Sequence, residues 1–218
     1  MKRIVILAML TLIVAAESVL AQTTGTVTVT GTNPAAVSIV NTSDANISTT
    51  MALGALTPAT GGAFASGNFQ ARLRSNKAYV LTAQATALAF NGLGAADNGD
   101  TIALADIGFG VTAVANTGAN VANSGSRSDA VVTKFDYTAS GFPAASNGLT
   151  PFVAGTHGTL NDITANTQIL SGSRVSRKGN ISTNNNFILV TFGVATLPQY
   201  FTPNTDFSTT ITLTVTAP

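Results

Sequence analysis

Residues 208–217 read STTITLTVTA, and they alternate between polar and apolar side chains through most of their length. Ile211, Leu213 and Val215 fall on one side of an extended chain, and threonines fall on the other. A period of two is typical of a strand with one buried face and one wet face. Threonine suits the wet face because it is both β-branched and polar. This stretch therefore predicts a half-buried β-strand.

The same pattern occurs at the other end of the chain, where residues 24–32 read TGTVTVTGT. Val27 and Val29 point one way in an extended conformation. The threonines that point the opposite way are Thr26, Thr28 and Thr30. We expect a strand here too, and its partner is either another strand of the same chain or a strand of a neighbouring copy.

Seven further segments have strand-like composition between these two ends. They are residues 37–40, 68–74, 78–90, 107–114, 130–137, 167–175 and 187–195. In residues 68–74 the alternation places Phe69, Ala71 and Leu73 inward. Residues 187–194 are nearly all apolar, which predicts a central strand buried on both faces.

Turn-forming residues separate these segments, including Asn91-Gly92 and Asn147-Gly148, which supply the positive φ angles of tight hairpins. Many short strands joined in this way predict an all-β fold, an immunoglobulin-like antiparallel β-sandwich. A short helical turn is expected near Ala95 or in residues 159–164. The least patterned region, residues 116–128, is expected to be an exposed loop.

The first residues predict export from the cytoplasm. Lys2 and Arg3 precede an apolar run of about 13 residues, too short to cross a membrane comfortably, where a spanning helix needs about 20. Val19-Leu20-Ala21 then offers a signal-peptidase site before Gln22. We expect a signal peptide over residues 1–21 and a single sandwich domain over residues 22–218. The mature chain is expected in the periplasm, on the cell surface or outside the cell, with no membrane span.

Charged residues make up only 9% of the chain. Lys2, Arg3 and Glu17 belong to the leader, so eight basic and eight acidic residues remain in the mature part. A net charge of zero argues against a nucleic-acid partner, which would require a basic surface. The chain has no cysteine, which excludes disulfides and thiol catalysis, so its core alone must hold the fold.

The sequence offers no catalytic constellation. His157 is the single histidine and lies in a loop-like stretch, and Asp136 is the aspartate with the least ordinary context. Neither accompanies a nucleophile motif, so we predict that the protein is not an enzyme and needs no cofactor. Residues 97–100, DNGD, offer clustered oxygen ligands for calcium, although Asp and Asn are also ordinary turn residues.

Basic residues fall into two clusters, which an acidic glycan or a partner could contact if they are not simply solvated strand edges. The clusters are Arg72, Arg74 and Lys77, then Arg174, Arg177 and Lys178. Asn41, Asn46 and Asn180 each begin an N-glycosylation pattern, which matters only in a source that modifies such sites.

Three stretches of this exported, cysteine-free chain resemble bacterial fimbrial subunits, of the colonisation-factor type and of the spore coat protein U type of secreted β-sandwich. They are residues 24–32, residues 74–81 (RSNKAYVL) and residues 206–216. The resemblance implies an incomplete immunoglobulin-like sandwich whose missing strand is donated by the N-terminal segment of the next subunit. It also implies a periplasmic chaperone that holds the vacant place before assembly.

Donation of this kind is β-augmentation, in which main-chain hydrogen bonds give affinity and alternate side chains fill pockets. Thr26, Val27, Thr28 and Val29 would form the donor strand, with the two valines in the pockets. We therefore expect a structural or adhesion subunit of the cell surface that polymerises through its N-terminal strand. The alternative is a monomeric secreted β-sandwich that binds a glycan or host ligand.

Overall fold

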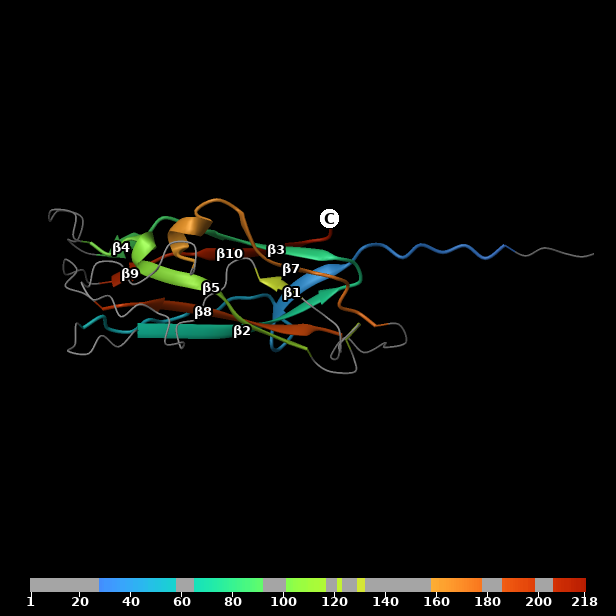
Figure 1. Cartoon of the computed structure of the whole chain (residues 1–218), viewed down its shortest axis with the longest axis horizontal. Coiled ribbons are helices and arrows are strands. Elements are labelled where there is room, and N and C mark those ends of the chain that lie inside the picture. The colour runs from blue at the N-terminus through green and yellow to red at the C-terminus, as the bar shows by residue number, and fades with distance from the viewer. Residues whose placement is uncertain are drawn as a thin grey trace, which may run out of the picture. The chain divides into compact units, whose positions relative to one another are not determined.

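The computed structural model describes residues 28–57, 65–91, 101–116, 121–122, 129–131, 158–177, 186–198 and 206–218. The expectation of an all-β sandwich is confirmed, because these residues form antiparallel strands in two main sheets (Figure 1). Both sheets lie within residues 35–218.

The first sheet has the order β1-β2-β8-β5. Its strands are β1 (Val37–Asn41), β2 (Ala65–Ser75), β8 (Ile188–Thr196) and β5 (Ile107–Asn116). As predicted, β8 is central, with β2 and β5 on either side of it. It is fully buried from Phe192 onward, whereas Leu189 and Thr191 are half-buried. These two residues pair with Arg72 and Gln70 of β2, whose polar side chains cover that outer face only partly.

The second sheet has the order β10-β3-β7-β6. Its strands are β10 (Ile211–Thr216), β3 (Tyr79–Ala85), β7 (Thr167–Gly172) and β6 (Ala130–Val131). The predicted alternation of the C-terminal strand is confirmed, since its apolar residues are half-buried and its threonines exposed. Figure 1 shows β3, β7 and β10 in one layer and β2 and β8 in the other.

Large apolar side chains fill the space between the sheets. Phe69, Phe192 and Phe109 stack across the inner face of β2, β8 and β5, with ring centroids 4.9 Å and 6.3 Å apart. The other sheet contributes Tyr79 and Leu81, and both are fully buried. Burial of such side chains stabilises a fold by about 1.5–3 kcal/mol each. The described core therefore supplies stability that a chain without cysteine cannot obtain from disulfides.

A stretch without regular structure covers the inner face of β2 where β1 has ended. Gly67 has the inward parity of Phe69, and a Cβ there would lie 3.1 Å from the backbone oxygen of Ala52. The half-buried residues of this stretch that pack against the core are Ile47, Met51, Leu53 and Leu56. The close backbone approach explains why position 67 is a glycine.

The single long strand predicted over residues 78–90 is wrong in detail, because the structure divides it into β3 and β4 (Ala89–Asn91). The β3–β10 ladder pairs Ala85 with Ile211, and its register shifts by one residue before β4 pairs with β9 (Asp206–Ser208). Thr86 lies at this interruption: its backbone N donates to Thr210 O over 3.0 Å, and its hydroxyl lies 3.2 Å from that of Thr209. An extra residue of this kind is a β-bulge.

The expectation of an exposed loop over residues 116–128 is wrong at Val121 and Ala122, which are 2% and 4% exposed. The Ala122 N–H donates to the Val175 carbonyl over 2.8 Å, and Val121 forms a bridge with Ser176. A contact between segments so far apart in sequence leaves no local pattern. The other residues between 117 and 128 lie outside the described part.

A helical turn is confirmed at η3 (Leu160–Ile163), whereas Ala95 lies outside the described residues. A second 3₁₀ turn, η1 (Leu104–Asp106), was not predicted from the sequence. The strand expected over residues 130–137 is described only as β6, and β7 ends at Gly172 rather than at residue 175.

Replacing Gly172 with alanine should destabilise the sandwich. A Cβ at this position would overlap the Asp129 carboxylate and lie 2.8 Å from the Tyr79 ring and hydroxyl. Because the Tyr79 hydroxyl donates to Asp129 over 2.8 Å, the new methyl group would disturb a partly buried hydrogen bond. We expect a loss of about 1–3 kcal/mol in the free energy of unfolding, measured by urea denaturation. Gly31→Ala, which meets nothing within 4 Å, is the matched control and should change little.

Candidate functional site

The N-terminal segment that the sequence singles out is exposed where the structure describes it. Residues 28–34 form neither helix nor strand, and Val29 is 91% exposed. Thr28 and Val29 of the predicted donor strand are thus placed, whereas Thr26 and Val27 lie outside the described residues. Pairing of this segment within its own chain is not found for residues 28–32.

Two hydrogen bonds fix the point where this segment joins the sandwich. The Ala36 N–H donates to Asn76 Oδ1 over 2.7 Å, and the Asn76 N–H donates to the Ala36 carbonyl over 3.0 Å. Asn76 lies in the turn between β2 and β3. The segment before β1 is therefore joined to the end of the sandwich that carries this turn.

Strand β10 is an edge strand among the described residues, since it pairs with β3 alone. An edge strand presents backbone N–H and C=O groups on which another strand can pair. Its inward side chains Ile211, Leu213 and Val215 are only half-buried. These are the two properties that β-augmentation requires of an acceptor: hydrogen-bonding groups along the edge and apolar surface beside them.

Strand β1 forms the facing edge of the other sheet, and it lies beside β10. It pairs with β2 alone among the described strands, and its Val37 and Ile39 are also half-buried against the core. The edge made by β1 and β10 therefore has apolar side chains from both sheets.

The order of six strands corresponds to an immunoglobulin domain, in which one sheet reads A-B-E-D and the other has C beside F and F beside G. Strands β7 and β6, on the other side of β3, have no counterpart in that arrangement. Strands β1, β2, β8 and β5 match A, B, E and D in both sheet order and chain order. Strands β3 and β10 match C and F. No described strand takes the place of G, beyond the outer edge of β10.

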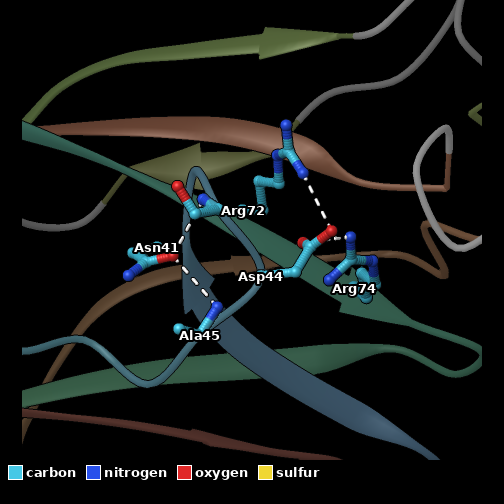
Figure 2. Close-up of polar contacts among 6 residues, drawn as sticks. Asn41, Asp44, Ala45, Arg72 and Arg74 are labelled. Carbon is cyan, nitrogen blue, oxygen red and sulfur yellow. Dashed lines mark hydrogen bonds and ion pairs between the residues drawn. The ribbon is translucent and has the colours of Figure 1, made fainter.

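A tight turn after β1 positions a charged group over the outer face of β2. Asn41 Oδ1 accepts hydrogen bonds from the backbone N–H groups of Ser43 and Ala45, at 2.8 and 3.0 Å. Asp44 within this turn has a φ of 63°, a conformation that Asp and Asn tolerate better than most residues. The turn directs the Asp44 carboxylate toward Arg72 and Arg74 (Figure 2).

Asp44 binds both arginines at once. Arg72 Nη1 lies 3.0 Å from its Oδ2, and Arg74 Nη2 lies 2.6 Å from its Oδ1. Residues two apart on a strand share a face, which is why the two arginines converge on one carboxylate. Both guanidinium groups also lie over the Phe187 ring, 4.5 and 5.6 Å from its centroid. No local pattern indicates that Asp44 and Phe187 complete this cluster, because both are distant in sequence from the two arginines.

The hydrogen bond from Arg74 lowers the pKa of Asp44, and the bond from Arg72 and the charges of both arginines act in the same direction, against a smaller opposing effect of burial. The Asp44 side chain is 32% exposed, so solvent screens these interactions and their contribution to stability is modest. The cluster thus fixes the turn onto β2 at little energetic gain.

The structure brings the two basic clusters of the sequence to one end of the sandwich. The backbone N–H groups of Val175 and Ser176 both donate to the Ser75 carbonyl, over 2.9 and 2.8 Å. Residues 72–77 and 174–177 therefore lie side by side, and Lys178 is outside the described part. Lys77 Nζ also donates to the Pro218 carbonyl over 3.0 Å.

The remaining candidates offer no site among the described residues. Asp106 and Asp162 accept hydrogen bonds from the backbone N–H groups three residues before them, at the starts of η1 and η3. No group of three or more metal-ligating side chains occurs in the described part. His157, Asp136 and residues 97–100 lie outside it, so the calcium hypothesis stays a prediction. No helix in the described regions has the length and apolarity to span a membrane.

No protein-family model matches the sequence, and no curated protein matches it significantly.

Replacing Asp44 with asparagine should change how stability depends on pH. A lowered pKa in the folded state means that the Asp44 ion pairs stabilise the fold above the ordinary carboxyl pKa. That contribution is lost as the pH falls through the lowered folded-state value. We expect Asp44→Asn to be less stable than the wild type at neutral pH, and the difference in melting temperature to shrink in acid.

Asparagine also tolerates the positive φ of position 44, so the substitution removes the charge with little backbone strain. Asp206→Asn is the matched control, because Asp206 is exposed in β9 and forms no ion pair with another described residue. An Asp44→Asn difference that stays constant from neutral pH to strong acid would contradict the assignment.

Proposed function

We propose that this protein is an exported structural or adhesion subunit of the cell surface that polymerises by strand exchange. The N-terminal segment of one copy adds to the open edge of β10 in another copy. In this arrangement the added strand takes the place of strand G of an immunoglobulin domain.

One observation carries the proposal: a strand-forming sequence lies exposed in a chain whose sandwich has an open edge strand. Residues 28–32 continue an alternating pattern but form no strand, while β10 lacks a partner strand on its outer side among the described residues. Val29 would bury a side chain that is now 91% exposed. The near-neutral surface also suits assembly, because little net charge opposes association.

The chemistry of the donor segment agrees with this role. Val27 and Val29 would enter the apolar edge formed by Ile211, Leu213 and Val215, while the threonines between them would face water. Each buried valine contributes about 1.5–3 kcal/mol. The main-chain hydrogen bonds of the added strand supply affinity that does not depend on side chains.

Deletion of residues 22–32 should abolish oligomers and leave a folded monomer. The reason is that the deleted residues precede β1, and the described core contacts come from residue 37 onward. We expect the exported wild type to form oligomers in sedimentation velocity and the deletion variant to sediment as a monomer, with an unchanged β-type circular dichroism spectrum.

A matched pair of double variants tests which face of the segment is buried. Val27→Asp with Val29→Asp should prevent assembly, whereas Thr28→Asp with Thr30→Asp should weaken it far less, because its charges remain on the wet face. Equal oligomers from the wild type and the deletion variant would contradict the proposal.

The alternative function, a monomeric binding module for a glycan or host ligand, has one supporting observation. Two arginines lie over an aromatic ring at an end of the sandwich that gathers most of the basic residues of the mature chain. Such a surface suits an acidic glycan. A wild-type monomer that binds a sulfated polysaccharide, with binding lost in Arg72→Gln, would favour this function over polymerisation.

A further inference from the structure

Charge is distributed unequally along the sandwich. Strands β2 and β8 pair Leu73 with Ile188 at one end of the sheet and Ala65 with Thr196 at the other. The described lysines and arginines all lie at or near the first end, which we name the basic end: Arg72, Arg74, Lys77, Arg174 and Arg177. Two described aspartates lie among them, Asp44 and Asp129, so this end carries a formal charge of +3 from its described side chains.

The opposite end carries the other three described aspartates, Asp106, Asp162 and Asp206, and we name it the acidic end. Asp106 immediately precedes Ile107, which pairs with Thr196, and η3 with Asp162 lies beside η1. Asp206 lies in β9, beyond the end of the β3–β10 ladder. No described lysine or arginine accompanies them, so their formal charge is −3. Figure 1 shows β4 and β9 at one end of the sandwich and the C-terminus at the other.

We propose that copies of this chain associate end to end, the basic end of one copy against the acidic end of the next. This inference rests on the proposed function and adds to it the surfaces that meet. Complementary potentials steer such an encounter and fix its orientation. Because the two surfaces differ, a pair of associated copies leaves one basic end and one acidic end unused, and the association can continue as an open chain.

The place where the N-terminal segment is joined agrees with this orientation. The hydrogen bonds between Ala36 and Asn76 hold the start of β1 at the basic end. A segment that leaves there meets the acidic end of the next copy, where β10 begins at Ile211. From its N- to its C-terminus the segment runs back toward its own sandwich, whereas β10 of the next copy runs away from the acidic end. The added strand would therefore lie antiparallel to β10. The nine residues 24–32 would span about 30 Å when extended, which is more than the length of roughly 20 Å of the six-residue β10.

The closing experiment reverses the charge of one side chain at each end, in separate variants. Arg177→Asp makes the basic end more acidic, and Asp206→Lys makes the acidic end more basic. We expect each variant alone to lose the oligomers that the wild type forms in sedimentation velocity. An equimolar mixture should form one-to-one pairs, because the intact acidic end of Arg177→Asp then meets the intact basic end of Asp206→Lys. Raising the salt concentration should weaken wild-type assembly, since salt screens exposed charges.

Gln70→Lys is the positional control, because Gln70 is exposed on β2 between the two ends. It should assemble as the wild type does. Circular dichroism and urea denaturation establish that each variant is folded. If a reversal variant does not fold, Arg177→Gln and Asp206→Asn replace the pair, and the expected result is a smaller salt dependence of assembly.

The outcomes separate this inference from the proposed function. Loss of assembly on deletion of residues 22–32, with both reversal variants assembling as the wild type does, would overturn the end-to-end contact alone. Assembly that survives the deletion would overturn strand exchange, and a mixture that still forms one-to-one pairs would then support the charged contact by itself. A wild type that remains monomeric at all salt concentrations would overturn both.

Discussion

The structure depends on burial of two apolar sheet faces against each other. The inner face of β2, β8 and β5 contributes a row of three stacked phenylalanines, and the facing sheet contributes Tyr79 and Leu81. Because side chains alternate along a strand, a shift of one residue would turn each strand's apolar set to water. The core therefore fixes strand register as well as stability, which matters in a chain without a single cysteine.

The alternation that builds the core also creates the open edge. Strand β10 buries its apolar residues only by half, because it is paired on one side alone among the described strands. Exposed edges promote association with other chains, and many proteins block them with charged residues. Residues 211–216 carry no charge and place threonine at every outward position. An uncharged edge of this kind would promote aggregation of an isolated domain, whereas it suits a subunit that assembles through that edge.

Because only 9% of the residues are charged, the position of each charged side chain strongly affects the distribution of charge over the molecule. The described cations lie toward one end because the β2–β3 turn and the segment after β7 meet there through the Ser75 carbonyl. Asp44 forms ion pairs with Arg72 and Arg74 and joins the turn after β1 to the outer face of β2. Local ion pairing and the longer-range polarity of the sandwich therefore come from the same few residues.

Local periodicity was sufficient to determine which residues face inward along several strands. The positions of Ile211, Leu213 and Val215, the inward set of β2 and the central place of β8 all follow from the spacing or the density of apolar residues. Such patterns record the environment of a strand, because the pleat fixes the direction of each side chain. The alternation of residues 24–32 predicted a strand without deciding its partner, and the described part of that stretch, residues 28–32, belongs to no strand.

Only the tertiary structure decided which strands meet. The pairing of Thr214 with Thr82, the approach of Val175 to Ser75 and the capture of Asp44 by Arg72 and Arg74 join residues that are distant in sequence. The burial of Val121 and the bulge at Thr86 depend on the same distant contacts. The alternation of a strand specifies its faces but not its neighbours. The neighbours follow from the path of the chain between the two layers, and that path places the open edge and the two charged ends.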